Sequence, residues 1–385
     1  MSTLSLAAAP AYNGVPVSKA IPMTAPRPQP GILDISAYVP GASGGGSAIK
    51  LSANESPLGP SRKAIEAYAS VAASLERYPD GGALALRQAL AAAHGLDPAR
   101  IVCGSGSDEL LYLIATAYLG QGTEALFTEH SFAIFKLATL GRGATPVIAP
   151  EQDLTTDIDA LLARVSAHTR VVFLANPNNP TGTYIPFSEV RRLHRGLPEE
   201  TVLVLDAAYA EYVRRGDYEA GLELVSSTRN TIMTRTFSKV YGLAGLRLGW
   251  AYCPEHIADV LNRIRPAFNV SSAAQAAGIA ALGDRAHIDA AVAFNDRWLP
   301  WMTQRLSALG LMVVPSAGNF VLVGFRDAKG AAAADLFLRA RHIYLRPMGA
   351  YGLGHTLRLT IGTETENKAV VAALTDFTDA MDKTS

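Results

Sequence analysis

One lysine stands in a neighbourhood that could support covalent chemistry. Lys239 follows Thr236 and Ser238, precedes a glycine-rich turn, and is followed eight positions later by Arg247. Desolvation in an apolar setting lowers the pKa of a lysine, and the neutral amine is then a nucleophile for Schiff-base formation. Two hydroxyl groups and a guanidinium nearby could hold a dianionic phosphate. Because a lysine alone is most often a solvated surface charge, this interpretation depends on the rest of the chain.

A carboxylate closes an apolar run earlier in the chain. Asp206 follows the apolar residues 202–205, and Tyr209 comes three positions later. A carboxylate at a buried strand end needs a cationic partner or a metal. No His, Cys or carboxylate cluster with metal-ligand spacing lies nearby in the sequence, so we expect an organic cation and no metal. The alternative is that Asp206 only caps the following turn.

Two loops have the composition of ligand-binding turns. Residues 104–109 (GSGSDE) precede a predicted helix, whose N-terminal N–H groups together with the turn could bind an anion near Gly106, Ser107 and Asp108. A dinucleotide fingerprint requires glycine at position 109, which is Glu109, so that interpretation is excluded. An ordinary glycine-rich turn is the alternative. Residues 176–182 (NPNNPTG) follow an apolar run and could direct the Asn179 amide toward a strand end.

These segments lie between predicted elements of alternating type. Helices are predicted over 83–93, 107–118 (with a Ser or Asp cap), 158–165 and 187–195, and buried strands over 125–128, 171–175, 202–206, 231–236 and 248–253. This alternation predicts an α/β fold, with a mostly parallel sheet between helices. Ligands of such sheets bind beyond the carboxyl ends of the strands, where the segments above lie. A long helix after residue 286 and strands at 319–323 and 356–361 predict a smaller α+β domain.

Composition excludes several functional classes. The chain has 385 residues, of which 49% are hydrophobic and 18% charged, so it can form a large core and is not intrinsically disordered. Its 34 basic and 34 acidic residues give no cationic excess for nucleic acid or an anionic membrane. Cys103 and Cys253 are too few for a disulfide framework. We expect no membrane span and no secretory signal, and therefore a cytoplasmic protein.

Taken together, the segments resemble fold-type I pyridoxal-phosphate aminotransferases and, within them, the histidinol-phosphate aminotransferase family. Residues 51–61 (LSANESPLGPS), 78–81 (YPDG) and 357–363 (LRLTIGT) add to the resemblance, which extends from about Ile32 to the C-terminal helix. The resemblance implies a large domain over 76–285 that binds pyridoxal 5'-phosphate and a small domain over 286–385. It also implies that 32–75 contributes to the small domain and the substrate site. Residues 1–31, rich in Pro and Ala, are predicted to form a flexible arm.

The resemblance implies a role for each cofactor-binding residue. Lys239 would form the Schiff base and move the proton, Asp206 would pair with the pyridinium nitrogen, and Tyr209 with Asn179 would hydrogen-bond the phenolate oxygen. The phosphate-binding residues would be Gly106, Ser107, Asp108, Thr236, Ser238 and Arg247, with Tyr78 of the partner subunit in a homodimer with shared sites. Phe132 stands where the family usually stacks a tyrosine on the cofactor ring.

Substrate recognition rests on the resemblance more than on the spacing. Arg358 and Arg346 are suited to oxyanions, because a guanidinium binds them in a fork. Tyr38 matches a family tyrosine that reaches the substrate phosphate, although Ala37 replaces the usual preceding proline. Asn54 is also expected at the substrate. The predicted reaction is ping-pong transamination between L-histidinol phosphate and 2-oxoglutarate, giving imidazole-acetol phosphate and glutamate, as in histidine biosynthesis.

Three alternatives remain open from the sequence. An aromatic amino-acid aminotransferase has the same catalytic set with a different pocket. A phosphothreonine decarboxylase is similar in sequence and cleaves the bond from Cα to the carboxylate. A non-catalytic pyridoxal-phosphate-binding regulator would need a DNA-binding module, and the chain before residue 32 has no basic helix-turn-helix.

Overall fold

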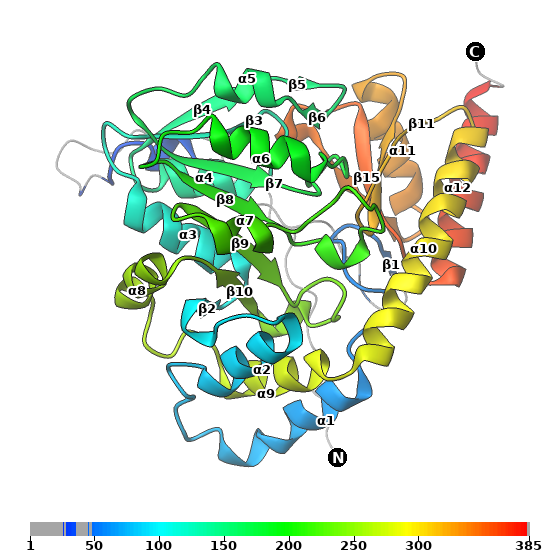
Figure 1. Cartoon of the computed structure of the whole chain (residues 1–385). Coiled ribbons are helices and arrows are strands. Elements are labelled where there is room, and N and C mark those ends of the chain that lie inside the picture. The colour runs from blue at the N-terminus through cyan, green and yellow to red at the C-terminus, as the bar shows by residue number, and fades with distance from the viewer. Residues whose placement is uncertain (1–25, 27, 36–44, 46–47, 383–385) are drawn as a thin grey trace.

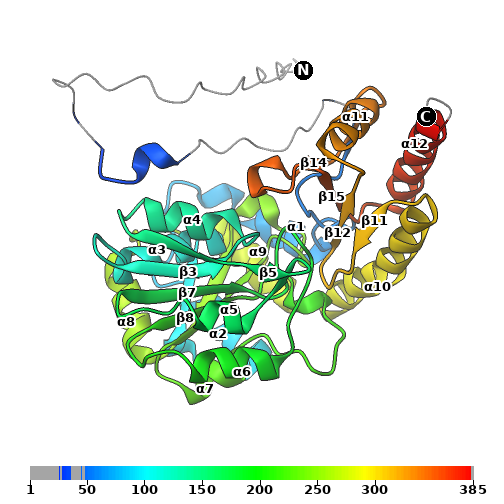
Figure 2. The same ribbon diagram turned by 90° about the horizontal axis from the view of Figure 1, so that it is seen from above.

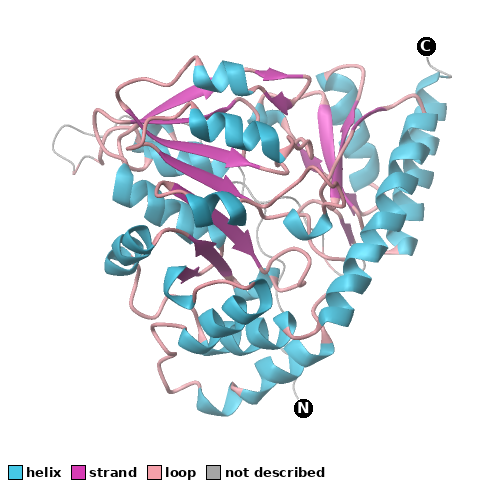
Figure 3. Cartoon of the chain, viewed as in Figure 1, coloured by secondary structure: helices cyan, strands magenta, loops and turns pink. Residues whose placement is uncertain are grey.

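The computed structural model describes residues 26, 28–35, 45 and 48–382. Most of the predicted arm, residues 1–31, lies outside these residues, and so does Tyr38. Within them the chain forms a larger domain around one sheet and a smaller one around another, coloured magenta in Figure 3. No helix of the described residues is long and apolar enough to cross a membrane.

A seven-stranded sheet organises the larger domain. Its spatial order is β2 (Ile101–Gly104), β10 (Gly249–Tyr252), β9 (Thr231–Thr236), β8 (Val202–Asp206), β7 (Thr169–Ala175), β3 (Glu124–Thr128) and β4 (Thr145–Ala149). The pairs from β9 to β4 are parallel, whereas β10 is antiparallel to both of its neighbours. The predicted mostly parallel α/β fold is confirmed. Apart from the edge strand β4, the strands are almost completely buried, which explains their apolar runs.

Helices cover both faces of this sheet (Figure 2). One face carries α3 (Ser107–Tyr118), α4 (Ala133–Leu140) and α8 (Glu255–Ile264). The other carries α5 (Ile158–Leu162), α6 (Phe187–Arg195), α7 (Leu222–Ser227), α2 (Leu84–His94) and α9 (Ser272–Leu282). The predicted ends of the helices 107–118 and 187–195 are confirmed, but α5 ends three residues early, where the chain tightens into a turn closed by a Val165 N–H bond to Leu162.

The smaller domain is built on a four-stranded antiparallel sheet. Its order is β11 (Met312–Val314), β12 (Phe320–Gly324), β15 (Thr356–Thr360) and β14 (Arg346–Pro347). Helices α10 (Arg285–Ala308), α11 (Ala328–Arg339) and α12 (Glu364–Asp382) enclose its core. In Figure 1 the long helix α10 leaves the base of the larger domain and runs up beside α12.

Shorter elements join the two domains. The strand β1 (Ile49–Lys50) pairs in parallel with β13 (Ile343–Tyr344), so residues 49–50 join the smaller domain. The helix α1 (Arg62–Ser70), capped by Ser61, packs instead on α9 of the larger domain. A hairpin of β5 (Glu151–Gln152) and β6 (Thr155–Thr156) follows β4. Short 3-10 helices cover Ile32–Asp34, Ala72–Ser74, Pro98–Arg100, Ala210–Tyr212, Ala244–Leu246 and Gly349–Tyr351.

Candidate active site

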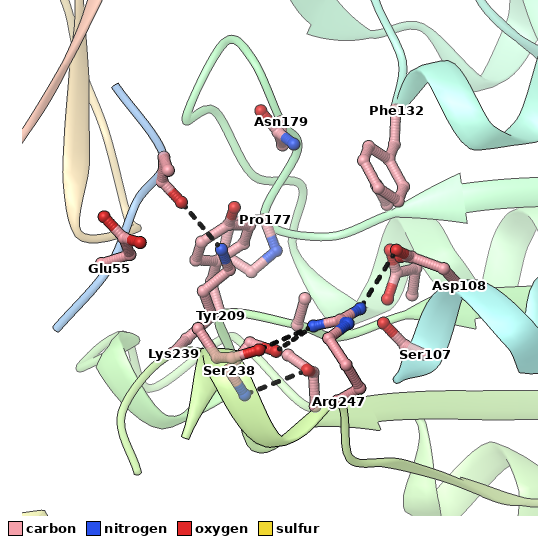
Figure 4. Close-up of a pocket in the computed structure, with 16 residues that line it drawn as sticks. Glu55, Ser107, Asp108, Phe132, Pro177, Asn179, Tyr209, Ser238, Lys239 and Arg247 are labelled. Carbon is pink, nitrogen blue, oxygen red and sulfur yellow. Dashed lines mark hydrogen bonds and ion pairs between the residues drawn. The ribbon is translucent and has the colours of Figure 1, made fainter. Parts of the chain in front are cut away.

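A cavity of about 220 Å³ opens where three central strands end (Figure 4). Ala175, Asp206 and Thr236 are the last residues of β7, β8 and β9, and all three line it. The cavity brings together most of the residues that the sequence predicts for one site. Its lining consists of Ala53, Glu55, Ser107, Asp108, Phe132, Ala175, Pro177, Asn179, Asp206, Ala208, Tyr209, Thr236, Ser238, Lys239, Ala244 and Arg247.

Lys239 enters the cavity from the turn after β9. Its Nζ donates a hydrogen bond to the Ala53 carbonyl oxygen at 3.3 Å and lies 5.7 Å from the centre of the Tyr209 ring. Burial, together with the positive charge of Arg358, lowers the pKa of Lys239 to about 8. A larger fraction of its amine is therefore neutral, and nucleophilic, near neutral pH than in an exposed lysine.

Asp206 faces the same cavity from the end of β8. Its side chain is 5% exposed and accepts a hydrogen bond from Thr234 Oγ1 at 3.0 Å. Burial raises the pKa of Asp206 to about 7, and the Thr234 hydrogen bond opposes that rise. A buried carboxylate with one hydroxyl partner gains most from a cation placed in the cavity.

Tyr209 lines the cavity and is fixed by two contacts. Its hydroxyl accepts a hydrogen bond from Asn54 Nδ2 at 2.9 Å, and its ring packs edge-on against Phe320. Burial raises the pKa of Tyr209 to about 12, so it remains a neutral hydroxyl. Asn54, which was predicted to contact the substrate, is buried. Its backbone N–H donates a hydrogen bond to Thr360 Oγ1 at 2.9 Å. Asn54 thus orients Tyr209 in this structure.

At its opposite end the cavity is lined by hydrogen-bond donors. The turn at Gly106, the Ser238 hydroxyl and the Arg247 guanidinium form this phosphate cradle. Gly106 at φ 86° precedes α3, and a Cβ there would lie 2.5 Å from Arg247 Nη2. Arg247 Nη1 donates a hydrogen bond to Ser238 Oγ at 3.3 Å, and Arg247 Nη2 forms an ion pair with Asp108 Oδ2 at 3.3 Å. The predicted Ser or Asp cap of α3 is wrong: its N-cap is Gly106, and no side chain caps the first turn. The first-turn N–H groups therefore remain available to an anion in the cavity.

Phe132 and Asn179 line the cavity on the side of β7 and α4. Phe132 is the N-cap residue of α4, and its ring meets Phe135 edge-on at 5.9 Å between centroids. Asn179 Oδ1 accepts a hydrogen bond from Arg358 Nη1. Arg358 itself does not line the cavity. It also donates a hydrogen bond to the Ser52 carbonyl oxygen at 3.0 Å and lies over the Phe320 ring.

Arg346 and Tyr78 lie outside this cavity. Arg346 on β14 is directly opposite Arg358 on β15, so the two side chains share one face of the small sheet. Tyr78 is 80% exposed and stacks on Phe268 at 4.5 Å between centroids. Tyr38 lies outside the described residues.

The structure adds residues that the sequence reasoning missed. Glu55 lines the cavity and forms an ion pair with Lys50 at 2.8 Å. Thr234 supports Asp206, and its position two residues before Thr236 on one strand was a usable signal, because alternate residues share a face. Glu109 accepts the Ser105 N–H at 2.6 Å and so closes the glycine turn.

The cavity fits one cofactor chemistry well. The cradle at α3 suits a phosphate, the buried Asp206 carboxylate suits a cationic ring nitrogen, and the Lys239 amine suits an aldehyde. The flat Phe132 ring beside them suits an aromatic ring. Pyridoxal 5'-phosphate has all four features. Within the described part of the chain, no group of three or more His, Cys, Asp or Glu residues could hold a metal ion.

Comparison with known proteins agrees with this chemistry. The sequence profile of aminotransferase class I and II matches residues 47–374. Histidinol-phosphate aminotransferases of Rhodopseudomonas palustris and Paramagnetospirillum magneticum are 55% and 56% identical, over 92% and 93% of this chain and 99% and 100% of theirs. The crystal structure of the Sinorhizobium meliloti histidinol-phosphate aminotransferase in complex with pyridoxal-5'-phosphate is 33% identical with a TM-score of 0.83, covering 87% of this chain and 92% of that one.

The folding pattern, the chemistry of the cavity and these similarities agree. The chain belongs to the aminotransferase class I and II family, among its histidinol-phosphate aminotransferases.

Proposed function

We propose that this chain is a pyridoxal-phosphate-dependent transaminase that exchanges an amino group between L-histidinol phosphate and 2-oxoglutarate. The products are imidazole-acetol phosphate and glutamate, and the physiological role is histidine biosynthesis. One observation carries the proposal: a single cavity combines the Lys239 amine of lowered pKa, the buried Asp206 carboxylate and the phosphate cradle at Gly106. The close relatives named above support the choice of substrate.

The residues of the cavity divide the work of proton transfer. The bound cofactor supplies an electron sink for the pair released at the substrate carbon. Asp206 stabilises the protonated ring nitrogen, which keeps that sink effective. The Lys239 Nζ would take the proton from the substrate Cα and deliver it to the cofactor carbon C4′. Tyr209 and Asn179 would hydrogen-bond the phenolate oxygen, and Phe132 would stack on the ring.

The phosphate of the cofactor binds at the opposite end. The N–H groups at Gly106, Ser107 and Asp108, the hydroxyls of Thr236 and Ser238, and the guanidinium of Arg247 are its ligands in this proposal. The positive end of the α3 dipole adds to their attraction. Anchoring at both ends holds the ring in one orientation, which a stereospecific proton transfer requires.

Two arginines and two polar residues are proposed for the substrate. Arg358 and Arg346 lie directly opposite each other on neighbouring strands. A guanidinium binds oxyanions in a fork, and both substrates carry an anionic group that one or both of these arginines would bind. We propose that Tyr38 binds the substrate phosphate. Asn54, which contacts the Tyr209 hydroxyl, is also proposed to bind the substrate.

We further propose a cytoplasmic homodimer with shared active sites. Tyr78 and Phe268 form an exposed aromatic stack, and other apolar side chains nearby in the sequence are exposed as well. They are Ile65, Tyr68, Leu75 and Leu84. A second copy of the chain would cover such a surface and would bring Tyr78 to the partner's phosphate site. The buried free thiols of Cys103 and Cys253 suit a reducing compartment.

Half-reaction spectroscopy on the purified enzyme tests the function. Histidinol phosphate, glutamate, phenylalanine and phosphothreonine are added separately, and the loss of the visible cofactor absorption is followed together with formation of pyridoxamine phosphate. We expect rapid conversion with histidinol phosphate and with glutamate. Conversion mainly by phenylalanine would identify an aromatic amino-acid aminotransferase. Carbon dioxide release from phosphothreonine would identify a decarboxylase, and a protein that binds no pyridoxal phosphate would not be a transaminase.

A further inference from the structure

A partly buried histidine–glutamate pair lies beside the cavity on its Phe132 side. His130 Nδ1 is 2.9 Å from Glu151 Oε2, and the backbone N–H of His130 donates to Glu151 Oε1 at 3.1 Å. The two side chains are 13% and 3% exposed. The hydrogen bond to Glu151 raises the pKa of His130, which favours a charged imidazolium. One carboxylate thus fixes both the ring and the backbone of His130.

His130 connects two walls of the cavity. It stands two residues before Phe132, at the entrance to α4 where no side chain caps the helix. Its carbonyl oxygen accepts a hydrogen bond from Asn178 Nδ2 at 3.0 Å. Asn178 is buried, donates also to Thr181 Oγ1 at 3.0 Å, and directly precedes Asn179. A displacement of His130 would therefore move both the Phe132 ring and the Asn179 amide, which line the cavity.

The same pair is linked to the smaller domain. Glu151 belongs to the β5–β6 hairpin, whose Leu154 carbonyl oxygen accepts a hydrogen bond from Thr183 Oγ1 at 2.8 Å. A Cβ at Gly352 would lie 3.9 Å from His130 Nε2, so the imidazole faces the loop that follows β14. Leu154 packs against apolar residues of the smaller domain, namely Val314, Leu322, Met348 and Leu353.

We propose that Glu151 and His130 are positioning residues that hold the Phe132 ring and the Asn179 amide against the bound cofactor and tie both to the smaller domain. The inference rests on the proposed cofactor, but it is independent of the substrate. Neither residue lines the cavity, so neither is a catalytic residue. An ion pair that is largely removed from water contributes little net stability, because its desolvation costs about as much as its attraction returns. The two Glu151 oxygens contact the ring and the backbone N–H of the same residue, and this arrangement is well suited to fixing the position of His130.

Four variants separate the contacts of the pair. Glu151→Ala removes both hydrogen bonds, and Glu151→Gln keeps an acceptor of the same shape without the charge. His130→Leu removes the ring donor, whereas His130→Asn places an amide N–H near the position of Nδ1. Gln152→Ala, on the same strand and exposed, is the local control. Leu161→Ala, a buried change in α5, controls for a general loss of stability.

Two measurements on each cofactor-loaded variant test the proposal without substrate. The first is the visible circular dichroism of the bound cofactor divided by its absorbance, which reports the asymmetry of its surroundings. The second is the dissociation constant for pyridoxal phosphate. For Glu151→Ala and His130→Leu we expect a changed dichroism ratio and a dissociation constant raised at least about tenfold, since small misplacements of positioning groups are costly. For Glu151→Gln, both the dichroism ratio and the dissociation constant should lie between the values of these variants and those of the wild type.

The controls decide between positioning and mere stability. His130→Asn should stay within about threefold of the wild-type dissociation constant and keep its dichroism ratio, because it restores the donor. Leu161→Ala should lower the thermal midpoint and leave the ratio unchanged. The proposal is overturned if the ratio is the same in all variants, or if His130→Asn loses as much as His130→Leu. A wild type that binds no pyridoxal phosphate would refute the cofactor assignment instead.

Discussion

Burial perturbs the two central ionisable groups of the cavity in opposite directions. It lowers the pKa of Lys239 to about 8 and raises the pKa of Asp206 to about 7, because each charged form loses hydration. Lys239, Asp206 and most of the other residues that line the cavity were predicted from the sequence. It could not predict that Asn54 contacts the Tyr209 hydroxyl, or that Asn179 contacts Arg358, because those contacts join segments that only the fold brings together.

Capture of the cofactor by the apoenzyme should depend on the proton of Lys239. Only the neutral amine attacks an aldehyde, so the rate should rise about tenfold per pH unit below the pKa and level off above it. The midpoint should lie near pH 8. Stopped-flow absorbance between pH 6 and pH 11.5 measures it. Lys239→Ala should show no covalent capture and almost no turnover, and the exposed Lys136→Ala should match the wild type. A midpoint near 10.5, the value of an ordinary lysine, would contradict the effect of burial.

Asp206→Asn should slow the half-reaction while leaving the covalent link intact. The substitution removes the charge that stabilises the protonated ring nitrogen, and loss of one such electrostatic group typically costs roughly 100- to 1000-fold in rate. Rapid-mixing absorbance with histidinol phosphate measures the rate, and the visible band confirms that cofactor remains. Asp289→Asn on the exposed face of α10 is the control. An unchanged rate would exclude Asp206 as the ring partner.

Asp206 should also make the stability of the apoenzyme depend on pH. Its folded-state pKa, about 7, lies above its usual 3.8, so its contribution is full below pH 3.8 and is lost as the pH rises through 7. The free energy of unfolding of the apoenzyme should therefore decrease across this window by more than that of Asp206→Asn. Denaturant titrations at pH 5 and pH 8 compare the two. Equal decreases would show that the Asp206 carboxylate is not perturbed.

Arg358→Ala should impair both half-reactions. If one guanidinium binds the anionic group of each substrate, its loss should raise both KM values roughly 100-fold, the usual cost of removing a buried charged partner. Separate titrations with histidinol phosphate and with glutamate measure this. Arg263→Ala, which is exposed on α8, is the control. A loss confined to one substrate would mean that the two substrates use different anion sites.

At the scale of elements, sequence patterns predicted best where local rules decide the structure. The strands β8 and β9 and the helices α3 and α6 have the predicted ends, because turns and polar residues bound their apolar runs. The antiparallel direction of β10 was not predictable, since an apolar run carries no information about strand direction. The domain limits remain a prediction. Within residues 32–75, β1 pairs with β13 of the smaller domain, whereas α1 packs on α9 of the larger domain.

The turn before α3 gives a prediction at this scale. Gly106 has φ 86°, and an added Cβ would lie 2.5 Å from Arg247 Nη2. Gly106→Ala should therefore displace Arg247 and raise the dissociation constant for pyridoxal phosphate, by about tenfold or more if one phosphate contact is lost. Equilibrium dialysis measures it. Gly120→Ala, where a Cβ meets nothing within 4 Å, should bind like the wild type. Equal affinities would mean that the cradle does not hold the phosphate.

At the scale of the whole molecule, one chain leaves its proposed site incomplete. Tyr78 is 80% exposed and does not line the cavity of its own chain, although the resemblance assigns it to the cofactor phosphate. The exposed aromatic stack of Tyr78 on Phe268 gives a second chain an apolar surface to cover. A symmetric dimer would satisfy both observations, since each copy would donate the same residue to the other.

Mixing two variants that each lack one of these two residues tests that arrangement. Lys239→Ala chains keep Tyr78, and Tyr78→Ala chains keep Lys239, so a mixed dimer holds one site with both intact residues. Unfolding the two variants together and refolding them at equal concentrations should restore up to about a quarter of wild-type activity, since half of the dimers are mixed and each has one complete site. Light scattering should give a dimer throughout. The Lys239→Ala variant refolded with itself should stay inactive, which excludes recovery caused by refolding. If the mixture has only the average activity of its two components, Tyr78 acts within its own chain or not at all, and the shared site is refuted.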